Sequence, residues 1–339
     1  MRLLRMLLAG ALMVVPVLAT GAGVLHAGKV GVKGWPAGVR DIRFTSPADN
    51  SRQPALFYVP PGRSQKRPLL VALHTWSRNY LQPTGEAYAD WCVEKGWIFV
   101  HPNYRGANVR PAATGSELVV ADILAAVEYA RAHANVDESR IYLVGYSGGG
   151  HASLLMAGRA PEIWAGVSAW APITDLKAWY WQTKDGAFRH YAEHIRKSCG
   201  GVPWGNTRAA RECRKRSPIT YLHNAVGVPL DINAGIQDGH TGSVPTSHAL
   251  DAYNLLANEE DRLTPQQVRT IVDKAVIPRE LGLPFSDPLF GTNKILFRRQ
   301  SGHVRITISD GAHQIKREAA LQWLSQQRKV QGATTRPRR

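Results

Sequence analysis

The chain has 339 residues, with 42 Lys and Arg against 26 Asp and Glu and a formal net charge of +16 at pH 7. This length accommodates one large domain or two small ones. The sequence holds no basic helix with interleaved aromatic residues, which argues against nucleic-acid binding, and no spacing of cysteines and histidines that is typical of a zinc site.

The first 27 residues have the pattern of an export signal. Arg2 and Arg5 supply the charged start, and residues 7–18 form an apolar stretch that is short for a membrane span. Cleavage is expected near Ala19 or Ala27. The pattern predicts a mature protein that is periplasmic or secreted, with no stable membrane anchor after cleavage. An uncleaved membrane anchor is the alternative.

The last residues, 328–339, are expected to form a disordered basic tail, since they hold five cations and no acid. Without these five charges and the two of the signal, the folded body carries +9. Such a charge favours anionic surfaces or polyanionic substrates such as acidic polysaccharide. A solubilising role for the charge is the simpler interpretation.

Strand and helix patterns alternate between these ends, which predicts an α/β fold with a mostly parallel central sheet and helices on both faces. Apolar, strand-forming runs occupy residues 39–45, 55–59, 68–74, 97–100, 141–144, 165–170, 229–234, 294–297 and 304–309. The first two and the last two runs are expected to form antiparallel hairpins. Helical patterns cover residues 86–95, 117–133, 150–157 and 315–327, and Gly96 is expected to end the first of them.

One domain, residues 28–327, is expected, with an inserted segment at about residues 176–228. The insert follows a strand on the side of the sheet where loops line the ligand crevice, so it is expected to form a lid. Its Trp179 and Trp181 are candidates for substrate contact. Alternatively, the inserted segment packs on the surface of the domain and does not contact the substrate.

Two of the three cysteines lie in the insert. In an oxidising compartment, Cys199 and Cys213 could form a disulfide, which would stabilise the fold by about 3 kcal/mol in the chain-entropy model. Cys92 lies in a helical pattern and is expected to be a buried thiol.

The segment Gly145-Tyr146-Ser147-Gly148-Gly149 is the most informative in the chain. It follows an expected strand and precedes an expected helix. A serine between glycines at such a turn is typical of the nucleophile elbow of α/β-hydrolases. The strained turn requires small neighbours, and the helix N-terminus offers free N–H groups to an oxyanion. A glycine-rich turn with an inert serine is the alternative.

A nucleophilic serine needs a base, and the base needs an orienting carboxylate. In α/β-hydrolases both follow the serine along the chain, the acid before the histidine. His313 follows the last strand and precedes the closing helix, so it is the expected base, with His240 and His248 as competitors. Asp238 follows a strand and is the expected acid, with Asp175 as the runner-up.

The oxyanion of acyl transfer needs two backbone donors. Gly148, directly after the nucleophile, is expected to supply one N–H. The other is expected from Thr75 or Trp76, in the loop after the strand that ends at His74. Many esterases carry glycines in this loop, so the Trp76 ring would narrow the pocket and form a wall for the substrate.

Together these motifs resemble the catalytic domain of the prolyl oligopeptidase family of α/β-hydrolases, over about residues 68–327. The segments that carry the resemblance are Asn103-Tyr104-Arg105-Gly106, Val136-Asp137-Glu138-Ser139-Arg140-Ile141, Ser217-Pro218-Ile219-Thr220-Tyr221, Asp238 with Val244-Pro245, and Gly311-Ala312-His313. The resemblance implies the α/β-hydrolase fold and supplies most of the preference for Asp238 as the acid. Family peptidases usually carry an N-terminal β-propeller; with roughly 40 residues between the signal and the first core strand, none is expected here.

The sequence therefore predicts an exported serine hydrolase that works through an acyl-enzyme and needs no metal or organic cofactor. An ester of an acylated carbohydrate or an aryl ester is the first choice of substrate, by analogy with similar propeller-less esterases. A short peptide is the alternative substrate. A non-catalytic glycan-binding protein on the same fold is a third hypothesis. The oligomeric state is left open.

Overall fold

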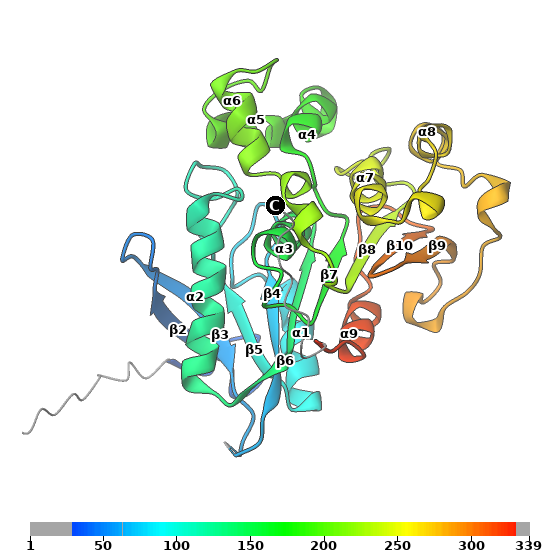
Figure 1. Ribbon diagram of the computed structural model, residues 1–339. Coiled ribbons are helices and arrows are strands. Elements are labelled where there is room, and N and C mark those ends of the chain that lie inside the picture. The colour runs from blue at the N-terminus through cyan, green and yellow to red at the C-terminus, as the bar shows by residue number, and fades with distance from the viewer. Residues whose placement is uncertain (1–28, 63, 330–339) are drawn as a thin grey trace, which may run out of the picture.

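The computed structural model describes residues 29–62 and 64–329. The predicted signal, residues 1–27, and most of the predicted tail, residues 328–339, lie outside this part of the chain. The described strands form one ten-stranded sheet in the order β1-β2-β3-β5-β4-β6-β7-β8-β10-β9 (Figure 1). Among the helices of the described residues, none is long and apolar enough to cross a bilayer.

The core of the sheet is parallel. The six neighbouring strands β5, β4, β6, β7, β8 and β10 pair in parallel, and antiparallel strands extend the sheet beyond β5 and beyond β10. The carboxyl ends of the parallel strands therefore meet at one edge of the sheet. The strands are β1 (Lys29–Val30), β2 (Arg40–Thr45), β3 (Arg52–Tyr58), β4 (Arg67–Leu73), β5 (Ile98–Pro102), β6 (Val136–Tyr146), β7 (Gly166–Trp170), β8 (Leu230–Gly235), β9 (Ile295–Ser301) and β10 (Val304–Ser309).

Helices cover both faces of this sheet, so the central strands are apolar without alternation, as in β5, where all residues are buried. One face is covered by α2 (Glu117–His133), α3 (Gly148–Arg159) and α7 (Ser247–Leu256), whose apolar side chains share one core with the strands. The other face is covered by α1 (Glu86–Lys95) and α9 (Arg317–Ser325). A further helix, α8 (Pro265–Lys274), packs beside α7.

Three helices stand above the carboxyl ends of the strands and form a cap, residues 176–217 (Figure 1). They are α4 (Leu176–Thr183), α5 (Arg189–Cys199) and α6 (Arg208–Lys215). The cap has a small apolar core of its own, which continues into Trp76 and Val244 of the body. The rest of the predicted insert forms two short 3₁₀ turns that pack on α3.

The predicted α/β fold is confirmed. The helices α1 and α2 have the predicted bounds, and Gly96 ends α1 in the left-handed region with a φ of 65°. Strand β6 is longer than predicted, because its first half is partly exposed and therefore lacks an apolar pattern. Residues 258–294, for which the sequence predicts no element, form α8 and three 3₁₀ turns.

Candidate active site

Ser147 lies in the turn between β6 and α3. Its φ and ψ are 58° and −119°, a strained conformation that few non-glycine residues adopt. The main-chain N–H of Ser147 donates to the carbonyl of Trp170 on β7 (2.8 Å), which ties the turn to the neighbouring strand. A Cβ on Gly145 would lie 2.1 Å from the carbonyl oxygen of Gly149, so the tight turn excludes any side chain there.

His313 and Asp238 join the serine through two hydrogen bonds. The Nε2 of His313 lies 2.9 Å from Ser147 Oγ, and its Nδ1 lies 2.7 Å from Asp238 Oδ2. Because Nδ1 faces a carboxylate, the proton of the neutral ring resides there, and Nε2 is free to accept from the serine hydroxyl. The structure thus brings together the three residues that the sequence analysis selected.

The acid is held by its own loop. Asp238 is 2% exposed, and its second oxygen accepts a hydrogen bond from the main-chain N–H of Val244 (3.0 Å). A Cβ on Gly242 would lie 2.1 Å from that same oxygen and 2.9 Å from Cβ of His313. Gly242 is therefore a site residue that the sequence analysis missed, since only the folded loop shows how closely it approaches the pair.

Two backbone nitrogens lie side by side near Ser147, those of Gly148 and Trp76. A Cβ on Gly148 would lie 2.4 Å from the Trp76 nitrogen, and neither N–H donates to another described residue. Thr75 is different, because both its N–H and its hydroxyl donate to Oε1 of Gln82 at 3.0 Å. The expectation that Thr75 supplies an oxyanion donor is therefore corrected, because its N–H is occupied by Gln82; Trp76, whose N–H has no partner among the described residues, stays the predicted donor.

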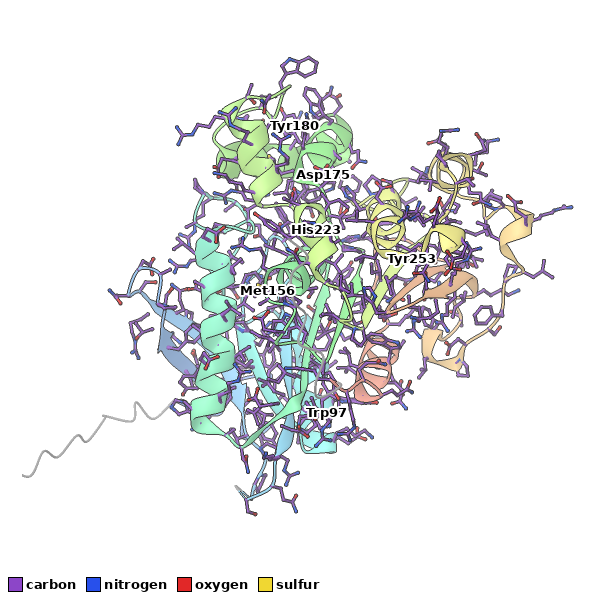
Figure 2. The ribbon with its side chains drawn as sticks, viewed as in Figure 1. Trp97, Met156, Asp175, Tyr180, His223 and Tyr253 are labelled. Atoms are coloured by element: carbon purple, nitrogen blue, oxygen red, sulfur yellow. The ribbon has the colours of Figure 1, made fainter. Side chains whose placement is uncertain are left out.

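The runner-up residues have other partners. Asp175 is the N-cap of α4 and accepts hydrogen bonds from the N–H groups of Lys177 (2.8 Å) and Ala178 (3.1 Å). Figure 2 shows Asp175 at the base of the cap, whose helices carry Tyr180. His240 faces the carbonyl of Val272 (2.8 Å). Neither contributes to the hydrogen-bonded chain at the serine.

His248, on α7, is buried below the cap. Its Nδ1 faces the main-chain N–H of Thr174 (3.2 Å) and so accepts, which leaves Nε2 to donate to Oε1 of Gln182 on α4 (2.9 Å). Burial lowers the pKa of His248 to about 3. The ring is therefore a neutral link between the cap and the body.

Trp179 is fully buried, which corrects its assignment as a substrate contact. Its ring packs against Trp76 (centroids 4.8 Å apart) and stacks on Tyr191 (4.9 Å). Its indole N–H donates to the carbonyl of Ser243 (2.8 Å), in the loop that holds the acid. Trp179 therefore fastens the cap both to the loop that carries Trp76 and to the loop that carries Asp238.

Trp181 lies two positions further along α4, which places it about 200° around the helix from Trp179. Its ring packs edge-on against Trp204 (5.5 Å), within the cap. Trp181 is 36% exposed, so its assignment as a substrate contact stays a prediction.

Tyr191 on α5 is the aromatic residue that the sequence analysis missed. It is half-buried, and its ring lies 6.5 Å from that of Trp76. It also stacks on Trp179 (4.9 Å), so it lies beside the loop that carries Trp76. No sequence pattern identifies it, since it reaches this place only through the packing of α5 on Trp179.

The cysteines of the cap meet across α5 and α6. The Sγ atoms of Cys199 and Cys213 are 2.7 Å apart, and both thiols are free and buried. Their pairing stays a prediction. Cys92 is fully buried, as expected, and burial raises the pKa of its thiol. Across residues 29–62 and 64–329, no group of three His, Cys, Asp or Glu side chains is placed to hold a metal ion.

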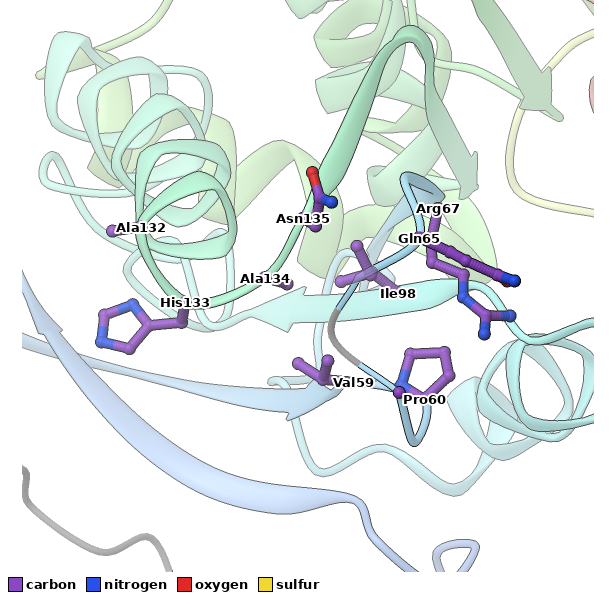
Figure 3. A pocket seen from close by; sticks show the side chains of 10 residues that line it. Val59, Pro60, Gln65, Arg67, Ile98, Ala132, His133, Ala134 and Asn135 are labelled. Atoms are coloured by element: carbon purple, nitrogen blue, oxygen red, sulfur yellow. The ribbon is translucent and has the colours of Figure 1, made fainter.

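A hollow of about 290 Å³ lies at the other end of the sheet (Figure 3). It is lined by Arg67 at the amino end of β4 and by Val59, Ile98 and His133. Ser147 follows the carboxyl end of a strand that runs parallel to β4. The hollow is therefore separate from the candidate active site.

The chain matches known proteins along most of its length. The model of the prolyl oligopeptidase family matches residues 85–271, more than half of the chain. Acylaminoacyl peptidase of Pyrococcus horikoshii has 18% identity and a TM-score of 0.56, with 84% of this chain and 40% of that chain covered.

Two further solved structures have the same fold at similar distance. A puromycin-hydrolyzing peptidase of Mycobacterium tuberculosis has 15% identity and a TM-score of 0.54, with coverage of 85% and 38%. Oligopeptidase B of Leishmania major has 14% identity and a TM-score of 0.51, with coverage of 85% and 35%. This chain thus spans about two fifths of the length of the solved structures it is similar to.

The family match includes both Ser147 and Asp238, and the structural neighbours share the α/β-hydrolase fold around them. The resemblance predicted from short motifs is thereby confirmed. The chain belongs to the prolyl oligopeptidase family of serine hydrolases.

Proposed function

We propose that Ser147 is the nucleophile of this hydrolase, with His313 as general base and Asp238 as the orienting acid. The observation that carries the proposal is the unbroken chain of two hydrogen bonds from Asp238 through His313 to Ser147 Oγ, at 2.7 and 2.9 Å. The separations match the hydrogen-bond reach that a nucleophile and its base require.

In this mechanism His313 Nε2 accepts the proton of Ser147 as Oγ attacks the carbonyl carbon of the substrate. The buried carboxylate of Asp238 holds the ring in the tautomer that leaves Nε2 unprotonated, and it stabilises the imidazolium that forms. Nε2 then donates the proton to the leaving group, and the acyl group remains on Ser147. A water molecule activated by the same nitrogen releases the acid and restores the serine.

The negative oxygen of the tetrahedral intermediate would be bound by the N–H groups of Gly148 and Trp76. Each N–H of such a pair contributes about 3 kcal/mol to the transition state, because it is fixed before the charge develops. The Gln82 contact with Thr75 supports this role, since it fixes the backbone directly before Trp76.

We propose an ester with an uncharged acyl group as the first substrate class, either on a carbohydrate or as an aryl ester. The side chains around the candidate site that support this choice are Tyr146 and Tyr191, which are aromatic and partly exposed, whereas the Trp76 ring, which was expected to form a substrate wall, is only 1% exposed. Rings of this kind bind aryl groups or the apolar faces of sugars.

A short peptide is the second candidate, and the family supplies the observation that favours it. The solved structures similar to this chain are named as an acylaminoacyl peptidase, a puromycin-hydrolyzing peptidase and an oligopeptidase. The same serine, histidine and oxyanion donors can cleave an amide. A purely glycan-binding protein is disfavoured, because binding alone does not require a buried carboxylate aligned with a histidine and a strained serine.

We also propose that the protein works outside the cytoplasm. The support is the charged and apolar pattern of residues 1–27. Its substrates would then be small or oligomeric esters, or short peptides, found outside the cytoplasm.

The substrate class is tested with purified protein on 4-nitrophenyl acetate, methyl ferulate, an acetylated xylo-oligosaccharide and a proline-linked peptide anilide. Ser147→Ala is compared with Ser286→Ala, a matched change at an exposed serine. Ester turnover that is lost only in Ser147→Ala supports the esterase. Turnover of the anilide alone supports the peptidase, and equal turnover by Ser147→Ala would contradict the proposed nucleophile.

A further inference from the structure

The positive charge of the body is concentrated in one segment. Residues 176–228 hold ten Lys and Arg and three Asp and Glu, a net charge of +7, whereas the whole body carries +9. A general solubilising charge would be spread over the surface. The asymmetry instead places a positive field on the cap, which stands above the candidate active site.

Several of these cations converge on the loop between α5 and α6, residues 200–207. Arg211 donates to the carbonyl of Asn206 (2.6 Å), and Arg214 donates to the side chain of Asn206 (3.1 Å). Lys177 donates to the carbonyl of Gly205 (3.2 Å). We call the surface around this loop the tip surface; it consists of Lys177, Trp181, Lys184, Trp204, Arg211 and Arg214.

Few carboxylates neutralise the tip surface. Lys184 pairs with Asp185, and Glu212 pairs with Lys215 (3.3 Å) and Arg216 (3.5 Å). In the described part of the chain, Lys177, Arg211 and Arg214 have no carboxylate partner. Arg211 and Arg214 are exposed and follow each other at one-turn spacing on α6, so they present charge along a line.

A large apolar side chain lies among these cations. Trp204 is 68% exposed, more than the other tryptophan of the surface, Trp181, at 36%. The loop that carries it is held from below, because the indole N–H of Trp181 donates to the carbonyl of Pro203 (3.3 Å). An anchored and exposed tryptophan surrounded by cations fits a ligand that has both negative charges and apolar faces.

We propose that the tip surface is an accessory binding site for an acidic polysaccharide. The carboxylates of a uronic-acid chain would pair with Arg211, Arg214 and Lys177, and a sugar ring would pack on Trp204. We choose this partner because its carboxylates complement the positive charge of the tip surface. An anionic membrane would require a larger exposed apolar surface than the tip provides, because the exposed large hydrophobic side chains there are Trp181, Val202 and Trp204, and they are surrounded by cations.

The tip surface lies close to the candidate active site but is separate from it. Trp181 and Trp179 occupy opposite sides of α4, and Trp179 contacts the loop that carries Trp76. The tip surface and that loop are thus separated by about the width of one helix, roughly 10 Å. The inference rests on the proposed function in one respect: a polymer held at the tip would present its acyl esters to Ser147.

Binding is measured by calorimetry with oligogalacturonate on Ser147→Ala, so that no turnover is needed. In this background Arg211→Gln/Arg214→Gln is expected to weaken binding roughly tenfold, and Trp204→Ala severalfold, with weaker binding at higher salt. Arg269→Gln/Lys274→Gln removes the same charge from exposed positions of α8 and is expected to change binding less than about twofold. Arg211→Lys/Arg214→Lys keeps the charge and is expected to retain binding.

An equal loss of oligogalacturonate affinity in the α8 control variant would contradict the proposed site, since it would indicate a general effect of net charge. The absence of oligogalacturonate binding would overturn it as well, and so would equal or tighter binding of single-stranded DNA or of vesicles of phosphatidylglycerol. With an intact Ser147, the tip variants are expected to hydrolyse 4-nitrophenyl acetate at the unaltered rate. Lack of that hydrolysis in the unmodified protein would count against the proposed function and leave the binding result unaffected.

Discussion

The hydroxyl of Tyr146 donates a hydrogen bond to the main-chain carbonyl of His313 (2.7 Å), and the two rings lie 4.9 Å apart. Tyr146 directly precedes Ser147, so the residue beside the proposed nucleophile also holds the loop that carries the proposed base, His313. Ser147 and His313, which lie far apart in the sequence, are therefore linked by this contact in addition to the hydrogen bond between their side chains.

Tyr146→Phe is expected to lower kcat roughly tenfold, because the ring packing stays but the His313 loop loses its anchor. Loss of the hydrogen bond is also expected to lower the free energy of unfolding by about 1 kcal/mol. Tyr142→Phe is the matched control, since Tyr142 of the same strand donates to the carbonyl of Gln327 (2.8 Å). It should show a similar stability loss with unaltered kcat; equal effects on kcat would contradict a positioning role for Tyr146.

Asp238→Asn is expected to lower kcat about ten-thousandfold while the protein stays folded, because an amide at this place no longer holds His313 in the required tautomer. Asp175→Asn keeps an N-cap residue on α4 and is expected to retain activity within about twofold. Steady-state kinetics on an ester and thermal melts of both variants check this prediction. A larger loss of activity in Asp175→Asn would make Asp175 the acid.

Oxidation is expected to join Cys199 and Cys213. With glutathione disulfide as the oxidant, the two thiols give their hydrogens and electrons to the glutathione, which is released as two thiols. The 2.7 Å separation of the sulfurs predicts an intramolecular bond, seen as a mass decrease of two hydrogens, and the bond is expected to stabilise the protein by about 3 kcal/mol. Cys213→Ala should abolish both changes. Bonds that form only between chains would contradict the prediction.

Buried histidines make stability depend on pH. Burial lowers the pKa of His248 to about 3 from its ordinary value of 6.5, so the unfolded chain binds its proton more tightly than the folded protein does. The contribution of neutral His248 to the free energy of unfolding is complete above pH 6.5. It falls by about 1.4 kcal/mol per pH unit as the pH drops from 6.5 towards 3.

Urea unfolding at pH 7.5 and 5.5 measures this effect, with His248→Gln as the comparison. Glutamine can keep a contact with Gln182 but does not titrate, so the loss of stability between the two pH values should shrink by about 1 kcal/mol in the variant. An identical loss in both proteins would show that His248 does not contribute. His151, whose pKa burial also lowers, to about 4, accounts for part of the loss that remains.

The parts of the fold that the sequence predicts well are those with local signals. Helix α1 ends at a glycine in a left-handed conformation, and α2 is capped at its N-terminus by Ser116, whose side chain accepts from the N–H of Val119. The elbow at Ser147 was predictable for the same reason, since strand, glycines and helix are adjacent in sequence. The order of acid and base along the chain came from the general α/β-hydrolase pattern, and the preference for Asp238 over Asp175 came mostly from the family resemblance.

The cap was not predictable at the level of single residues. The sequence suggests Trp179 as a substrate contact, because it lies among other aromatic residues of the insert. It does not show that Trp179 is buried against Trp76 and Ser243. Tyr191 is one of several aromatic residues of the insert, and only the packing of α5 brings it to the site. Thr75 and Trp76 were equivalent until Gln82, seven residues beyond Thr75, was seen to occupy the Thr75 donor. In each case the role of the residue depends on a contact with another segment of the chain, which the local sequence does not show.

The central claim is that Ser147 is a nucleophile activated by His313. A fluorophosphonate probe followed by peptide mass spectrometry tests it without any assumption about the substrate. The account predicts stoichiometric labelling of Ser147 in the unmodified protein, at least about a thousandfold slower labelling in His313→Asn, and none in Ser147→Ala. Labelling of another residue, or labelling of Ser147 at the same rate without His313, would contradict it.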